Sequence, residues 1–89
     1  MRAIITVVGI DRIGIIAGVS NLLADARVNI LDISQTILKE YFTMIMLVDL
    51  REMKISHKDL VDRLNKKGEE LGLSIKMQHE DLFNAMHRI

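Results

Sequence analysis

The sequence predicts one α+β domain, a two-layer sandwich in which a four-stranded antiparallel sheet carries two helices on one face. Two observations lead to this prediction. Short β-branched runs and amphipathic stretches with helical spacing follow one another in the order strand, helix, strand, strand, helix, strand. The chain has 89 residues, of which 49% are apolar, and this suits a single small core.

A turn with a glycine at each end joins the first strand to the first helix. Residues 3–8, AIITVV, are mostly β-branched, as expected for a buried strand. Gly9 and Gly14 bound the turn that follows. In residues 15–27 the apolar positions recur with the spacing of an amphipathic helix.

The middle of the sequence predicts a β-hairpin whose first strand is irregular. Residues 28–38 are rich in β-branched side chains, but the alternation of apolar positions shifts between Ile30 and Ile33, which predicts a β-bulge. A short charged break at 39–41 leads into residues 41–50, YFTMIMLVDL, which predict another strand. Two strands separated by so short a break form a hairpin.

A second helix and a fourth strand complete the domain. Ser56 and Asp59 form a variant of the capping box at the start of this helix, and Gly72 is placed to end it. Residues 73–79 alternate between apolar and polar side chains, which indicates an edge-like strand with one solvated face. The helix is expected to turn four residues toward the core, namely Leu60, Leu64, Gly68 and Leu71.

Two βαβ units that share a central hairpin give the ferredoxin-like βαββαβ sandwich, with the first and third strands inside the sheet. We assign residues 1–80 to this domain. Residues 81–89 carry apolar side chains at helical spacing and predict a short C-terminal amphipathic helix.

The two interior strands are apolar on both faces, although two helices can cover only one face of the sheet. An exposed apolar patch of several hundred Å² usually marks an interface. A second subunit, the C-terminal helix, or both are expected to cover the outer face. We favour a homodimer, because a tail of about 15 Å is too short to shield four strands.

Composition excludes several classes of function. Twelve basic and twelve acidic residues give no net charge, so nothing draws the chain toward nucleic acid or an anionic membrane. The absence of cysteine excludes thiolate metal sites, and no histidine pair has the spacing of a zinc site on a helix. No stretch approaches the roughly 18 apolar residues that cross a bilayer. We therefore expect a cytoplasmic protein without a metal or cofactor.

The glycine-bounded turn has the chemistry of an anion site. Gly9 and Gly14 let the backbone approach a ligand closely. Gly14, Ile15 and Ile16 begin a helix, so their N–H groups lack intrahelical partners and favour a carboxylate. A nucleotide phosphate loop is not indicated, because Ile15 and Ile16 stand where such a loop needs Lys and Ser/Thr.

The side chains around this turn can complement an amine. Asp11 can accept from a cation, and Asn29, expected beside the turn at the start of the second strand, supplies a donor and an acceptor. Ile10 and Ile13 can form apolar walls, so the set suits a zwitterion. A structural interpretation is also open, in which Asp11 caps the first helix, Arg12 is a solvated charge and Asn29 takes a left-handed turn conformation.

These residues resemble the ACT domain, a small regulatory module of amino-acid metabolism. Its usual signature is an Asp/Asn-Arg-Pro-Gly turn, an apolar helix and a Val/Ile-Asn-Ile strand start. The sequence DRIG at 11–14 matches except at the proline, which is Ile13 here, and VNI at 28–30 matches fully. In detail the chain is most similar to free-standing single ACT domain proteins of microbes.

The resemblance implies that an amino acid binds where two domains meet, between the first loop of one and the second strand of another. It implies regulation of a separate protein and no catalysis. A purely structural ACT dimer is the alternative, because some family members only dimerise. With the residues around the turn, the candidate ligand-binding set is Gly9, Ile10, Asp11, Ile13, Gly14, Ile15 and Asn29.

Other proteins with this order of elements match less well. Acylphosphatases use a loop arginine and a strand asparagine, for which Arg12 and Asn29 are candidates, but their glycine-rich aromatic loop is missing. RNA-recognition modules need aromatic residues on the two interior strands, and the first strand has none. Copper chaperones of similar fold need a CxxC pair, which is also missing.

Overall fold

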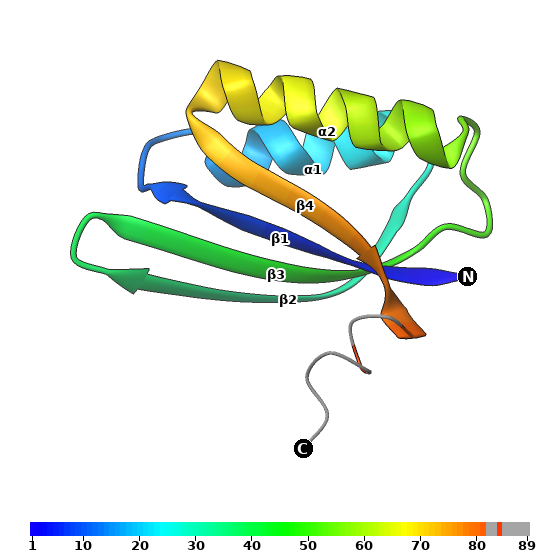
Figure 1. Cartoon of the computed structure of the whole chain (residues 1–89), viewed down its shortest axis with the longest axis horizontal. Helices are drawn as coiled ribbons and strands as arrows, with labels where there is room; N and C mark the ends of the chain where they lie inside the picture. The colour runs from blue at the N-terminus through cyan, green and yellow to red at the C-terminus, as the bar shows by residue number, and fades with distance from the viewer. Residues whose placement is uncertain (82–83, 85–89) are drawn as a thin grey trace.

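The computed structural model describes residues 1–81 and residue 84, and its elements follow the predicted order (Figure 1). The predicted C-terminal helix at 81–89 lies almost entirely outside the described residues. The strands are β1 (Arg2–Ile10), β2 (Asn29–Leu38), β3 (Tyr41–Asp49) and β4 (Leu73–His79), and the helices are α1 (Ile15–Asp25) and α2 (His57–Leu71).

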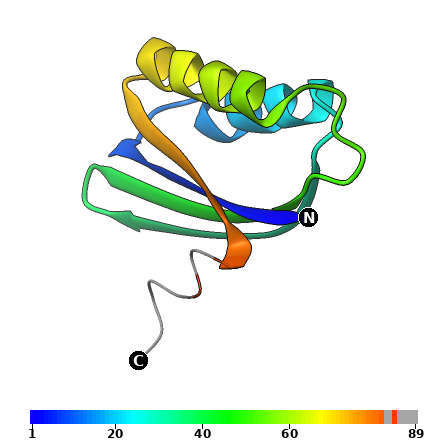
Figure 2. The ribbon, with the colours of Figure 1, turned by 45° about the vertical axis from the view of Figure 1, so that its right-hand side comes forward.

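The four strands form one antiparallel sheet in the order β2-β3-β1-β4, and both helices lie on the same face of it (Figure 2). The prediction of a ferredoxin-like sandwich with the first and third strands inside is therefore confirmed. Arg2 at the start of β1 and Asn29 at the start of β2 are both in register with Asp49 of β3. β1 and β2 consequently begin at one end of the sheet and finish at the other.

The predicted β-bulge lies near the start of β2. The register with β3 shifts between Ile30 and Asp32, which leaves Leu31 as the extra residue. This extra residue lets Ile30 and Ile33 point to the same face although they are an odd number of positions apart. The two-residue connection Lys39–Glu40 then closes the hairpin, and Lys39 takes a left-handed φ of 55°.

α2 begins and ends at the predicted residues. The Ser56 hydroxyl accepts a hydrogen bond from the backbone N–H of Asp59 at 3.1 Å. Gly72 ends the helix with a φ of 69°, and its N–H donates to the carbonyl of Gly68. Of the four predicted core positions, Leu60, Leu64 and Gly68 are buried, whereas Leu71 is half-buried.

The core lies between the sheet and the helices. Alternate residues of the interior strands enter it, so the helix-facing side of β1 and β3 is fully apolar. The strands contribute Ala3, Ile5, Val7, Phe42, Met44, Met46 and Val48, and the helices contribute Ile15, Val19, Leu23, Leu60 and Leu64.

The opposite face of the interior strands is also apolar, as predicted. This outer face carries five large side chains with 39–70% of their surface exposed, gathered toward the hairpin end of the sheet. They are Val8 and Ile10 of β1, Leu38 of β2, and Tyr41 and Ile45 of β3.

Candidate functional site

The turn between β1 and α1, residues 11–14, presents backbone donors at the start of a helix. Gly14 is the N-cap of α1 and has a φ of 93°. No heavy atom lies within 4 Å of the place where a Cβ of Gly14 would be. Among the described residues, none accepts a hydrogen bond from the N–H groups of Ile15 or Ile16. The start of α1 is thus open to an anion.

The other predicted residues of the turn lie around this opening. Ile13 is fully exposed and Ile10 is 52% exposed on the outer face, whereas the side chain of Ile15 is buried in the core. The side chain of Ile15 therefore cannot form a wall of this opening. Gly9 lies inside β1, and a Cβ there would be 2.5 Å from Leu73, so close packing against β4 accounts for this glycine.

Asp11 does not cap α1, and that interpretation is wrong because Gly14 occupies the N-cap position and no side chain caps the helix. The backbone N–H of Asp11 instead donates to the carbonyl of Glu40 at 2.6 Å. This bond fastens the turn to the β2–β3 hairpin. The carboxylate of Asp11 is exposed and has no partner among the described residues.

Arg12 is not simply a solvated charge. Its guanidinium Nη1 donates to the carbonyl of Leu71 at 3.0 Å, at the C-terminal end of α2. A cation at this position satisfies an orphan carbonyl and complements the helix dipole. Arg12 therefore ties the β1–α1 turn to the second helix.

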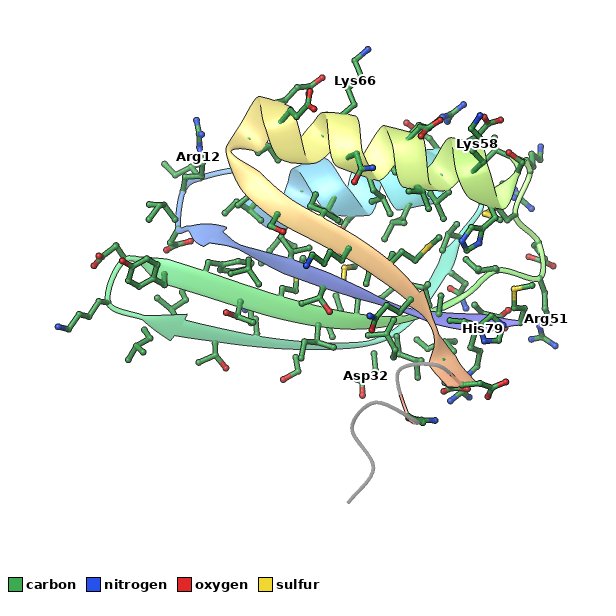
Figure 3. The ribbon with its side chains drawn as sticks, viewed as in Figure 1. Arg12, Asp32, Arg51, Lys58, Lys66 and His79 are labelled. Atoms are coloured by element: carbon green, nitrogen blue, oxygen red, sulfur yellow. The ribbon has the colours of Figure 1, made fainter. Side chains whose placement is uncertain are left out.

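Asn29 does not lie beside the turn, and this expectation is wrong within one copy of the chain. Asn29 is in register with Asp49 and hence with Arg2, at the start of β1, whereas the turn follows Ile10 at the other end of that strand. Eight strand residues separate the two positions by about 26 Å. Arg12 and Arg51, labelled in Figure 3, mark the two opposite ends. Nor does Asn29 have a left-handed backbone.

A hollow of about 360 Å³ adjoins Asn29, and no pattern in the sequence predicts it. The hollow is lined by Asn29, Asp49, Arg51 and Glu52. Strand pairing places Asn29 and Asp49 on the outer face, and the loop after β3 brings Arg51 and Glu52 to the same end. The charged residues at and after the end of β3 do not predict a site, because charged residues in connecting loops are commonly solvated.

The Asp49 carboxylate in this hollow is fixed by Arg51. One carboxylate oxygen accepts from the backbone N–H of Arg51 at 3.0 Å and the other from its Nε at 2.9 Å. The backbone hydrogen bond is the largest cause that lowers the pKa of Asp49 below its usual value, and the guanidinium adds to the effect. Asp49 is therefore charged and already paired at neutral pH.

Further hollows and clusters do not include the predicted residues. A hollow of about 330 Å³ between α1 and α2 has Asp25, Arg63 and Glu70 among its lining residues. Within residues 1–81 and 84, no three His, Cys, Asp or Glu side chains are placed to hold a metal ion. Over the same residues, no helix is long and apolar enough to cross a membrane.

Comparison with known proteins gives a consistent result. The family model for the ACT domain matches residues 2–78. A UPF0237 protein of Clostridium acetobutylicum is 57% identical over 89 residues, which is the full length of both chains.

Solved structures agree with this assignment. An ACT domain protein from Streptococcus pneumoniae has a TM-score of 0.81 and 45% identity, covering 98% of each chain. The regulatory subunit of aspartate kinase from Thermus thermophilus, in a ligand-free form, has a TM-score of 0.66 and 24% identity, over 86% of this chain and 50% of that one. At 24% identity, the similarity to the aspartate kinase subunit shows a shared fold and nothing more.

Proposed function

The chain belongs to the ACT domain family, a regulatory fold that binds small ligands, and we propose that two copies form a homodimer that senses an amino acid or similar metabolite. Each ligand would lie between the β1–α1 turn of one copy and the start of β2 of the other. The dimer would act in the cytoplasm on a separate protein, without catalysing a reaction itself.

The observation that carries this proposal is the placement of the two half-sites. The open turn and Asn29 lie at opposite ends of one sheet, so a small ligand cannot touch both within one copy. If two outer faces pack with their strands antiparallel, the Asn29 end of each copy comes to the turn end of the other. A two-fold axis then generates two equivalent sites.

The exposed outer face supports the same arrangement. Val8, Tyr41 and Ile45 form a contiguous part of it and are 39–52% exposed. Covering such a patch with a like patch removes apolar surface from water, which favours association by roughly 25 cal/mol per Å² before the costs of binding.

The proposed contacts follow from the charges at each end. The N–H groups of Gly14 and Ile15 would receive a carboxylate, because no described residue accepts a hydrogen bond from them and they lie at the positive end of α1. Asp11 of the same copy and Asn29 of the other would take the amine. Ile10 and Ile13 would provide apolar walls.

Regulation requires that the ligand favours one arrangement of the two copies. A ligand held by residues of both copies has that differential affinity, because it loses half of its contacts when the copies shift. The aspartate kinase subunit that shares this fold is a regulatory subunit, and the shared fold is compatible with a regulatory role here.

A thermal-shift screen of the common amino acids tests the proposal. An amino acid at about 100 times its dissociation constant should stabilise the wild-type dimer by about 2.7 kcal/mol. The shift should be lost in Asp11→Ala and in Asn29→Ala. If no amino acid shifts the wild type, the protein is a purely structural ACT dimer. If the variants shift as the wild type does, the ligand does not bind at Asp11 and Asn29, and the proposed site is wrong.

A further inference from the structure

The hollow beside Asn29 contains one charged group that nothing in the fold uses. Asp49 and Arg51 neutralise each other through hydrogen bonds of 2.9 and 3.0 Å. Glu52 lines the same hollow, is exposed, and has no hydrogen bond or ion pair with the described residues. Of the two carboxylates that line this hollow, Asp49 is paired with Arg51, and Glu52 is the one without a partner among the described residues.

We propose that Glu52, beside Asn29 of the same copy and facing Asp11 of the other, also receives the ammonium group of the ligand and thereby restricts the site to molecules with a free amine. The inference rests on the proposed function, since it concerns the ligand that the two copies share. It adds a specificity residue from the loop between β3 and α2, outside the residues that resemble the family signature.

Glu52 suits this role better than its neighbours do. Both oxygens of Asp49 already accept hydrogen bonds from Arg51, so an ammonium there would compete with an existing ion pair. Asn29 offers a neutral amide oxygen, and a hydrogen bond between a neutral and a charged group is weaker than one between two charged groups. Glu52 has both the charge and the free lone pairs.

The same argument sets the orientation of the ligand. In the proposed dimer, the turn of one copy would present N–H groups at the positive end of a helix, and Glu52 of the other copy would present a negative charge from the opposite side. A zwitterion placed with its carboxylate at the turn and its ammonium at Glu52 has both charges complemented. The reverse orientation would place like charges together.

Calorimetric titration of wild type and Glu52→Gln with the common L-amino acids and the matching 2-hydroxy acids tests the inference. The hydroxy acids keep the carboxylate and side chain but lack the amine. Wild type should bind its best amino acid at least about tenfold more tightly than the matching hydroxy acid, because a hydrogen bond between charged groups is lost. Glu52→Gln should bind that amino acid about tenfold more weakly and lose most of this preference.

Glu69→Gln is the matched control, since Glu69 is an exposed glutamate of α2 with no partner among the described residues. It should bind as wild type does. Unchanged amino-acid affinity in Glu52→Gln, with its thermal midpoint also unchanged, would overturn the role of Glu52 while leaving the proposed function standing. A wild type that binds none of the amino acids overturns both.

Discussion

At the residue scale, a side chain added at each of three glycines would meet a different environment. A Cβ on Gly68, in the middle of α2, would be 2.7 Å from the backbone carbonyl oxygen of Leu73. A Cβ on Gly18, in α1, would be 3.3 Å from the end of the flexible Leu71 side chain. Gly14 meets nothing, but its φ of 93° disfavours any side chain.

Alanine should therefore have opposite effects in the two helices. Gly68→Ala is expected to lower the free energy of unfolding by about 1–3 kcal/mol, because the methyl group forces α2 away from β4. Gly18→Ala should be neutral or raise it by up to about 1 kcal/mol through helix propensity. Urea unfolding measures both, and a stabilised Gly68→Ala would contradict the packing described here.

Asp49 predicts a dependence on acid pH. The pKa of Asp49 in the folded state lies below the ordinary value of 3.8. The carboxylate therefore stabilises the fold fully at pH values above the pKa that Asp49 has in the unfolded state. The contribution is lost as the pH falls through the folded-state pKa. The urea midpoints of wild type and Asp49→Asn should differ at pH 6, and the difference should begin to shrink below about pH 4 and disappear below the folded-state pKa.

Asp62→Asn is the matched control for Asp49, since Asp62 is an exposed aspartate of α2 without a partner among the described residues. If wild type and Asp49→Asn differ by the same amount at all these pH values, the hydrogen bonds from Arg51 do not hold the carboxylate in solution.

At the scale of elements, Arg12 connects two segments that are distant in sequence. The turn before α1 is held at one side by the bond from Asp11 to Glu40 and at the other by the bond from Arg12 to Leu71. Both bonds fix the position of the open N–H groups relative to the sheet. The turn, which is the proposed half-site, is consequently tied to both the hairpin and α2.

Arg12→Ala should lower the free energy of unfolding by about 1 kcal/mol, because a carbonyl at the end of α2 loses its donor. Lys66→Ala, which removes an exposed cation of α2 without a partner among the described residues, should have little effect. Denaturant unfolding compares the two variants. Equal stability of both would show that the bond from Arg12 does not persist in solution.

At the scale of the whole molecule, one face of the sheet lacks a covering layer among the described residues. Ile45 lies near the middle of this outer face and is 39% exposed. Ile16 of α1 is 41% exposed on the helical side. The two isoleucines are matched in residue type and exposure, and they differ in the face on which they lie.

If the proposed dimer forms through the outer face, Ile45→Asp should be a monomer at micromolar concentration, because a carboxylate would be buried against the apolar face of the other copy without a counter-charge. Ile16→Asp should remain dimeric. Sedimentation velocity distinguishes the two. A dimeric Ile45→Asp would place the interface elsewhere, with the exposed edge strand β2 as the next candidate.

The sequence sufficed for the architecture because its signals are local. β-Branched runs, the Ser56 cap, the Gly72 stop and the parity shift around Leu31 each act within a few residues. The candidate site was harder to predict from the sequence, because it depends on which ends of the strands lie together. The order of elements already implied that β1 and β2 run in the same direction, yet Asn29 was expected beside the turn that follows β1.

The remaining residues of the site carried no local signal. The bond from Arg12 to Leu71 joins positions 59 residues apart, and the hollow at Asn29 is completed by Arg51 and Glu52 from another loop. Charged residues in turns are mostly solvated, so neither contact could be inferred before the strands were paired in space.

The central claim is that each ligand site combines the turn of one copy with the Asn29 end of the other, and mixed dimers test it most directly. Asp11→Ala and Asn29→Ala chains are unfolded, mixed in equal amounts and refolded together, and amino-acid binding is measured by calorimetry. A mixed dimer contains one site in which both residues are intact, so the mixture should recover about a quarter of the wild-type sites, although neither variant binds alone. If each variant alone abolishes binding and the mixture recovers none, the two residues do not combine in one site across the copies and the claim is wrong.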